Sequence, residues 1–238
     1  MRVPEPAEIT VDQETYDRLM ERMRAKLGVG VPRSGTHVSD LIYCVLKTWA
    51  KKQLSYLPQN VLEEEEDDQV LVWVVGRSHE DIFGEGFSRG EPAVLDGIVG
   101  TVDWFDEVPV EAKSTRMSSN RHLEEIPHYT AQAAAYCVMH ETDWCRVLIF
   151  HINGDYYHQT KGGKAEKAMP RAHLRIYRVR FEADELEEWW EELKRRKVLV
   201  EGEEKPRAED EPDLIPVFDF ECGYCKVGGL VNCPQWEG

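Results

Sequence analysis

The spacing of apolar positions in the first quarter of the chain follows the period of a helix. Apolar side chains recur every three or four residues between positions 12 and 27, which predicts an amphipathic helix there. A second helix is expected from Asp40 to about Tyr56, with Ser39 as its N-cap and Cys44 in its first turns. The N-terminal part of the chain is therefore expected to be helical.

The rest of the chain alternates between strand-like and helix-like patterns. The run from Val70 to Val75 is rich in β-branched residues, but it continues to Phe83 without a turn signal, so one buried helix is expected there. The remaining predicted elements are strands at 93–105 and 108–114, a helix at 125–141, strands at 145–152 and 172–181, and a helix at 183–197. This order predicts an α/β fold with a mixed central sheet flanked by helices.

The composition limits the class of protein. At 238 residues, the chain is long enough for one large domain with a substantial core. It carries 29 basic and 45 acidic residues, and the net charge of −16 argues against a broad basic surface for nucleic acid, though not against a local basic groove. The N-terminus has no apolar signal core, and no apolar run approaches the ~20 residues that span a bilayer. We therefore expect a soluble, cytoplasmic protein with no membrane partner.

Cysteines gather near the C-terminus, in a spacing that is typical of metal ligands. Cys222 and Cys225 form a Cys-x2-Cys pair, and Cys233 follows closely. Thiolates at this spacing can face one ion from a tight turn, and in a reducing compartment they favour metal over disulfides. With Cys44 as the expected fourth ligand, zinc or an iron–sulfur cluster would join the two ends of the chain. Counting alone leaves two other candidates for the fourth position, Cys137 and Cys145.

A carboxylate–lysine group is predicted on a hairpin in the middle of the chain. If residues 106–108 form the turn, Asp103 lies directly across from Glu111. Lys113 shares a strand face with Glu111, while Ala112 points to the other face. Opposed carboxylates repel, and Mg²⁺ or Mn²⁺ would turn that repulsion into shared coordination. The pattern suits metal-dependent cleavage of phosphodiesters, and two unrelated surface carboxylates are the competing interpretation.

Three other residues become candidate site residues only because the carboxylate–lysine group is present. Gln132 and Tyr136 share one face of an alanine-rich helix and are placed to contact the scissile phosphate or a base. His79 is a candidate metal ligand. Taken alone, each is better explained as an ordinary packing residue. Asp96 competes with Asp103 but lies seven residues out of register.

Taken in order, these motifs resemble those of the RecB-like PD-(D/E)XK nucleases, and among them the iron–sulfur CRISPR-associated exonucleases of the fourth Cas family. The resemblance extends from about Val38 to Trp236. The segments that carry it are Val38–Cys44, Gly76–Glu80, Gly100–Asp103, Glu111–Lys113, Gln132–Tyr136, Cys222, Cys225 and Cys233-Pro234.

The resemblance implies a fold and a role for each matching residue. The fold would be a restriction-endonuclease-like core over residues 37–238, with an iron–sulfur segment at 217–238 and an N-terminal helical extension at 1–36. The ligands of a catalytic Mg²⁺ or Mn²⁺ would be His79, Asp103, Glu111 and the Ala112 carbonyl. Lys113 would be the catalytic lysine, supported by Gln132 and Tyr136. A cluster, usually [4Fe–4S], would be held by Cys44, Cys222, Cys225 and Cys233.

The function implied by the resemblance is a metal-dependent DNA exonuclease. It would hydrolyse phosphodiester bonds at single-stranded DNA ends, and it would act beside an integrase in CRISPR spacer acquisition. Two alternatives stay open. One is a recombination or repair nuclease of a phage or host, which keeps the enzyme class. The other is a zinc-stapled, non-catalytic DNA-binding partner of an integrase, against which the intact set of Asp103, Glu111 and Lys113 argues.

Overall fold

Two sheets and a set of helices make up the described part of the chain, which in this computed structural model comprises residues 13–28, 34–53, 67–153, 172–207, 220–223, 225 and 233. The helices are α1 (Gln13–Leu27), α2 (Val38–Ile42), α3 (Val45–Gln53), α5 (Asp67–Phe83), α6 (Pro127–Met139), α7 (Ala183–Glu201) and α8 (Phe220–Gly223), with a 3₁₀ turn, η1, at Leu123–Glu125. The strands are β1 (Thr36–His37), β2 (Ser88–Arg89), β3 (Ala93–Leu95), β4 (Ile98–Gly100), β5 (Trp104–Asp106), β6 (Val108–Thr115), β7 (Trp144–His151) and β8 (His173–Arg180).

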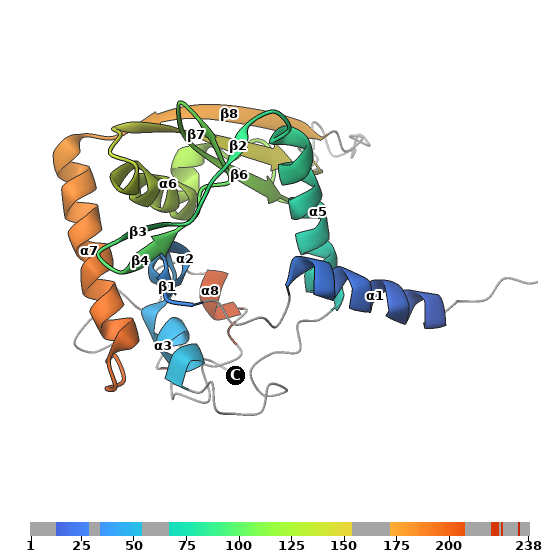
Figure 1. Cartoon of the computed structure of the whole chain (residues 1–238), viewed down its shortest axis with the longest axis horizontal. Helices are drawn as coiled ribbons and strands as arrows, with labels where there is room; N and C mark the ends of the chain where they lie inside the picture. The colour runs from blue at the N-terminus through green and yellow to red at the C-terminus, as the bar shows by residue number, and fades with distance from the viewer. Residues whose placement is uncertain are drawn as a thin grey trace, which may run out of the picture.

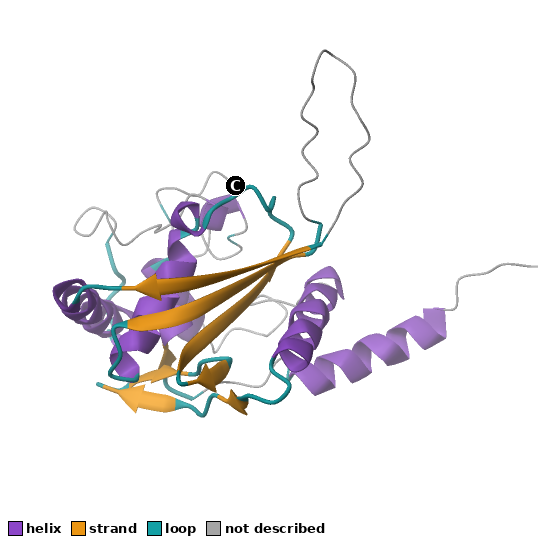
Figure 2. Cartoon of the chain, turned by 90° about the horizontal axis from the view of Figure 1, so that it is seen from above, coloured by secondary structure: helices purple, strands orange, loops and turns teal. Residues whose placement is uncertain are grey.

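The main sheet is mixed, as the order of elements predicted. Its strand order is β2-β5-β6-β7-β8, and β6 and β7 run parallel while the other neighbours are antiparallel. The long strands lie side by side and fan apart toward one end (Figure 2). A smaller sheet of order β1-β4-β3 lies beyond α6, so that α6 is enclosed between the two sheets (Figure 1).

The main sheet packs on α6 through one face. Residues alternate in burial along β7, and Cys145, Val147 and Ile149 face the helix. The helix presents small side chains to them, including Ala133 and Ala134, so its backbone lies close to the strands. A second core joins α2, α3 and α7 with the other side of α6.

Two predicted elements are divided in the structure. The single helix predicted from Asp40 to Tyr56 is two helices, α2 and α3, separated by an extended residue at Tyr43, and its first cap is His37 rather than Ser39. The chain breaks there because the Cys44 amide donates a hydrogen bond to the Glu221 carboxylate, at 2.9 Å, instead of continuing the helix. The predicted end at Tyr56 lies outside the described residues.

The predicted strand over 93–105 is likewise three short strands in two sheets. The turn that divides the first two lies at Asp96 and Gly97, both of which have a positive φ. Asp96 therefore does not compete with Asp103 for the hairpin, and its carboxylate instead accepts a hydrogen bond from the Trp190 indole at 2.8 Å.

The other predicted elements, α1, α5, α6, α7, β6, β7 and β8, are confirmed to within four residues at each end. The prediction that the helix at α5 is buried is wrong, because most of its described side chains, including Val72 and Trp73, are exposed. The apolar stripe of α1 is only partly covered, because Met20 is buried while Tyr16 and Leu19 are exposed. None of the described helices is long and apolar enough to cross a membrane.

Candidate active site

The hairpin of β5 and β6 places two carboxylates in the middle of the main sheet. Phe105 pairs with Pro109 in the register that the sequence predicted. The strand ladder ends at Trp104, and the Asp103 side chain then accepts a hydrogen bond from the Ala112 amide at 2.7 Å. The Asp103 carboxylate is thereby fixed against β6, at the level of its predicted partner.

Glu111 and Lys113 form a buried ion pair on one face of β6. The Glu111 side chain is only 3% exposed and the Lys113 side chain 25%, and one Glu111 oxygen contacts the ammonium. The other oxygen, Oε2, is buried and has no hydrogen-bond partner among the described residues. Leaving a buried carboxylate oxygen unpaired costs free energy, so this atom is the strongest local sign of an additional ligand.

The charges of this group shift one another's pKa values. Burial and the negative charge of Glu111 raise the pKa of Asp103 to about 7, against the opposing effects of Lys113 and the Ala112 amide. Burial also raises the pKa of Glu111, although Lys113 opposes it. Burial lowers the pKa of Lys113, but the two carboxylates outweigh that effect, so its pKa is raised and it stays charged. The site has a negative charge that one ammonium does not balance.

The donor atoms at this position suit a hard divalent cation. Asp103 and Glu111 supply carboxylate oxygens, and the Ala112 backbone between Glu111 and Lys113 supplies a carbonyl, which are the ligand types that Mg²⁺ and Mn²⁺ prefer. Within the described residues, no group of three or more His, Cys, Asp or Glu side chains is arranged to hold a metal ion. The fit therefore rests on two carboxylates and the unpaired Glu111 oxygen.

His79 lies beside the same strand but on its other face. Its Nδ1 is 2.9 Å from the Ser114 hydroxyl, and its ring packs edge-on against Phe150 with centroids 4.2 Å apart. Ser114 alternates with Lys113 along β6, so it points away from the face of the ion pair. His79 also lines a narrow cavity together with Ala112. Its role as a metal ligand stays a prediction.

Glu80 is the acidic residue of α5 that faces the carboxylates, and the sequence reasoning gave it no role. Burial raises its pKa, and the charge of Asp103 raises it further. Glu80 in turn raises the pKa of Glu111. Arg77 lies 2.9 Å from Glu80 and partly balances its charge. The available signal was its position directly after His79 in the helix motif.

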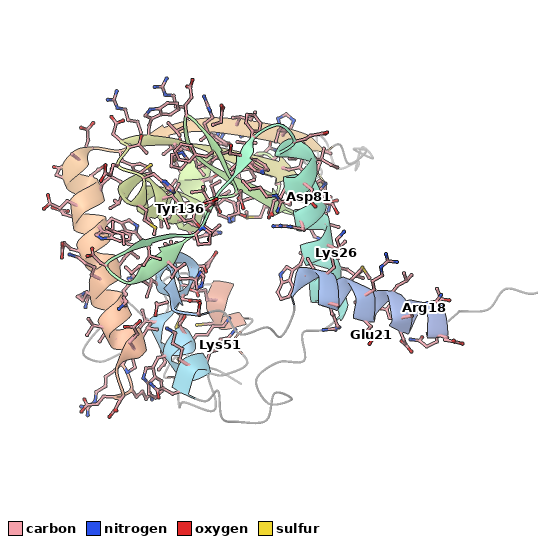
Figure 3. The ribbon with its side chains drawn as sticks, viewed as in Figure 1. Arg18, Glu21, Lys26, Lys51, Asp81 and Tyr136 are labelled. Atoms are coloured by element: carbon pink, nitrogen blue, oxygen red, sulfur yellow. The ribbon has the colours of Figure 1, made fainter. Side chains whose placement is uncertain are left out.

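Gln132 and Tyr136 contact each other on one face of α6, as their spacing predicted. The Gln132 amide donates a hydrogen bond to the Tyr136 hydroxyl at 2.8 Å. Burial raises the pKa of Tyr136, and the charge of Glu111 adds to that effect. A side chain at Gly100 would collide with Met139 and press on the Tyr136 ring, so glycine there allows β4 to lie against α6. Figure 3 shows Tyr136 within the body of the molecule, under the main sheet.

Three of the cysteines predicted to bind a cluster belong to the core around α2 and α3. Cys44 is buried, and Cys225 and Cys233 pack against the same core. Burial raises the pKa of Cys44 to about 12, and the charges of Glu221, Cys233 and Cys225 contribute. The Cys225 amide donates to the Cys222 carbonyl at 3.1 Å, which forms a turn between those two cysteines. Cys225 and Cys233 thus lie against the core that contains Cys44, but no three of these thiols are arranged to hold an ion in the part of the chain that the structure describes, so the cluster stays a prediction.

The two remaining cysteines lie elsewhere. Cys137 and Cys145 belong to the separate core between α6 and the main sheet, and both are fully buried there. A hydrogen bond between the two thiols and burial raise the pKa of Cys137. Their position agrees with the simpler interpretation of them as buried packing residues.

Comparisons with known proteins bear on the fold. No protein-family model and no curated protein sequence matches the chain. The crystal structure of SSO0001 is similar with a TM-score of 0.57 at 15% identity, covering 94% of this chain and 98% of that chain. Two further structures are similar at lower scores. They are a phage-related exonuclease from Haemophilus somnus 129PT (TM-score 0.33, 10% identity, 79% of this chain and 80% of that chain) and LHK-Exo in complex with dAMP (0.38, 13%, 74% and 97%).

The likeness to SSO0001 shows that the two chains share a fold over nearly their whole length. At the scores of the other two structures, the similarity carries no argument. The function therefore has to be argued from the residues of the site.

Proposed function

We propose that the protein is a metal-dependent nuclease that hydrolyses phosphodiester bonds in DNA. The observation that carries the proposal is the buried Glu111 oxygen, which has no hydrogen-bond partner among the described residues, next to the half-buried Asp103 carboxylate, whose pKa is raised. Such a pair is unfavourable by itself, and a divalent cation would supply the missing positive charge. Perturbed titratable groups of this kind are typical of catalytic sites.

The ligands of the cation would be Asp103, Glu111 and the Ala112 carbonyl, with His79 as the resemblance implies. When bound, the ion would polarise a phosphate oxygen and lower the pKa of an attacking water. Lys113 stays protonated beside Glu111, so its ammonium is placed to stabilise charge that develops on the phosphoryl group. The lysine acts here as a fixed positive charge.

Gln132 and Tyr136 would position the substrate. The Tyr136 hydroxyl accepts a hydrogen bond from the Gln132 amide, which leaves its own proton free to be donated toward a phosphate oxygen. The raised pKa of Tyr136 keeps that proton in place at neutral pH. The pair thus supplies an oriented neutral donor.

We further propose that Cys44, Cys222, Cys225 and Cys233 hold an iron–sulfur cluster. The shared core of three of these residues supports the assignment. A cluster would deprotonate the Cys44 thiol, whose pKa is otherwise high. Its role would be structural, because it would tie the C-terminal segment to the junction of α2 and α3.

The biological setting is proposed from the motif resemblance. The favoured reading is an exonuclease that trims single-stranded DNA ends beside an integrase during CRISPR spacer acquisition. A phage or host nuclease of recombination or repair would have the same chemistry. The genes that neighbour this one distinguish the two settings.

The test of the proposed chemistry is digestion of end-labelled single-stranded oligonucleotides with Mn²⁺. We expect the wild type to be active. Glu111→Gln and Lys113→Met should each lower the activity at least a hundredfold, because losing a catalytic charge costs about 3 kcal/mol. Glu21→Gln and Lys51→Met are matched controls, since Figure 3 places both residues at the periphery. Undiminished digestion by Lys113→Met, or an inactive wild type, overturns the proposal.

The cluster is tested separately by visible spectroscopy after anaerobic purification. We expect a broad visible absorption that is lost in Cys225→Ser and kept in Cys137→Ser. A colourless, zinc-loaded protein would overturn the cluster and, if it were also inactive, would favour a non-catalytic DNA-binding partner of an integrase.

A further inference from the structure

Three aromatic rings lead outward from the proposed catalytic lysine. The Lys113 ammonium lies over Tyr129, with Nζ 5.9 Å from the ring centroid. The His128 ring packs edge-on against Tyr129, with centroids 4.4 Å apart and planes at 70°. Tyr43 lies beyond His128 at 6.0 Å, tilted by 46°. The rings come from the end of α2 and the first turn of α6, so they form one continuous path.

The outer two rings are partly exposed to solvent. Tyr129 is buried and forms the inner wall, while Tyr43 and His128 are each only partly buried. Burial raises the pKa of Tyr43, and the positive charge of Lys113 opposes that shift. The path therefore offers exposed ring surface directly beside the proposed site of cleavage.

The charges around this path suit a nucleotide. Burial, followed by the charges of Lys113 and Arg121, lowers the pKa of His128 to about 4, so its imidazole is neutral at physiological pH. A neutral ring that is influenced by two cationic side chains offers a stacking surface in a region that favours phosphate. His128 also lies in the first turn of α6, where the helix dipole favours negative charge.

We propose that Tyr43 and His128 form a stacking platform for an unpaired base next to the scissile phosphate, and that this platform makes the site selective for single-stranded ends. The inference rests on the proposed function, because Lys113 marks where the phosphate is cleaved. A base in a duplex is stacked on its neighbours and would have to be extruded before it could reach the platform. An unpaired base needs no such step.

The platform also gives the cysteine segment a part in substrate selection. Tyr43 immediately precedes Cys44, whose amide is held by the buried Glu221 carboxylate. On the other side, the Arg196 guanidinium donates to the carbonyls of Leu41 and Ile42, at 3.0 and 3.3 Å. The extended conformation of Tyr43 is thus fixed from both ends, which orients its ring.

The experiment compares wild type, Tyr43→Leu and Tyr43→Phe, with Tyr16→Leu on α1 as a matched control. The substrates are a single-stranded oligonucleotide, the blunt duplex of the same sequence, and the single strand with one abasic nucleotide at the cleaved end. The readout is kcat/KM with Mn²⁺. We expect Tyr43→Leu to lower the ratio of single-strand to duplex activity by about tenfold, the effect of losing one stacked base. Tyr43→Phe should restore most of the ratio, and Tyr16→Leu should keep it.

The abasic substrate separates stacking from a merely structural role. Removal of the base should lower the activity of the wild type about tenfold but should have little further effect on Tyr43→Leu. An equal loss by Tyr43→Leu on all substrates, or an unchanged ratio, overturns the platform while leaving the nuclease intact.

If the wild type proves inactive, the proposed function fails and the platform is tested by binding. Fluorescence anisotropy with Ca²⁺ then measures the affinity for the same oligonucleotides. A preference for the single strand that depends on the base and on Tyr43 supports the platform, and equal affinity for the intact and abasic strands overturns it.

Discussion

At the scale of residues, the carboxylates of the active site lower the stability of the fold that holds them. Asp103 has a pKa of about 7 because it is buried beside Glu111, whereas its ordinary value is 3.8. Ionising Asp103 therefore costs more free energy in the folded, metal-free protein than in the unfolded chain. Such a cost is common where function requires charges to be held together.

Replacing Asp103 by asparagine should stabilise the metal-free protein while abolishing the proposed nuclease activity. Between about pH 4 and 7, Asp103 is protonated in the folded protein but ionised in the unfolded chain. The free energy of unfolding of the wild type therefore falls by up to ~1.4 kcal/mol for each pH unit of increase over this window. Above pH 7, Asp103 is ionised in both states and lowers the free energy of unfolding no further. We expect a stabilisation of roughly 1–3 kcal/mol at pH 8 that becomes much smaller at pH 5, as measured by urea denaturation.

Asp17→Asn on the exposed face of α1 is the control for this measurement. Equal effects of Asp103→Asn at both pH values would show that Asp103 is not under electrostatic strain.

The residues of the site differ in how well the sequence predicted them. Asp103, Glu111 and Lys113 were predicted because strand alternation and a tight turn fix register locally, and the structure brings these three together. Glu80 was missed because its approach to the carboxylates depends on how α5 lies against β6. The face of β6 that His79 contacts depends on the same packing.

At the scale of elements, α7 fixes the end of α2 through one buried arginine. The Arg196 guanidinium donates to the last carbonyls of α2 and to the Glu192 carboxylate at 2.8 Å. Arg196 thereby provides hydrogen-bond donors to carbonyls that the break at Tyr43 leaves without helical partners. The contact also holds the segment that leads to Cys44.

Arg196→Met should therefore destabilise the protein by about 3 kcal/mol, since buried carbonyls and Glu192 lose a charged donor. Arg196→Lys should recover only part of this loss, because an ammonium cannot reproduce the planar fork. Arg195→Met is the matched control, because Arg195 is the adjacent arginine and its side chain is exposed. Denaturant titrations in which the Arg196 and Arg195 variants are equally stable would contradict this account.

Replacing two glycines by alanine should change the free energy of unfolding in opposite directions. A Cβ at Gly90 would collide with the carbonyl of Val102, the residue before Asp103, whereas a Cβ at Gly76 in α5 meets nothing within 4 Å. We expect Gly90→Ala to lower the free energy of unfolding by about 1–3 kcal/mol. Gly76→Ala should raise it by about 0.5–1 kcal/mol, because alanine favours the helix. Thermal melts of both variants test the pair, and a stabilising Gly90→Ala is the contradicting result.

At the scale of the whole molecule, the net charge of −16 should make stability depend on salt. Raising salt from about 0.1 to 1 M shortens the Debye length from about 10 to 3 Å, which weakens repulsion between acidic surfaces. We expect the melting temperature of the metal-free protein to rise. The rise should disappear near the isoelectric point of about 5.0, where net repulsion is small. Equal salt effects at pH 5 and pH 8 would reject self-repulsion as the cause.

Local sequence patterns were enough to predict most of the elements and the register of the hairpin. Apolar periodicity placed the main helices and the long strands, because each is set by residues a few positions apart. Alternation along one strand likewise fixed the shared face of Glu111 and Lys113, and the cysteine spacing indicated a shared thiol centre.

Only the tertiary structure decided what lies around that chemistry. It broke the predicted helix at Tyr43, divided one strand between two sheets, and placed Glu80 beside the carboxylates. Each depends on contacts between residues far apart in the chain, such as the hydrogen bond from Cys44 to Glu221. Long-range contacts of this kind can outweigh local preference, because a buried polar group must find a partner wherever the fold supplies one.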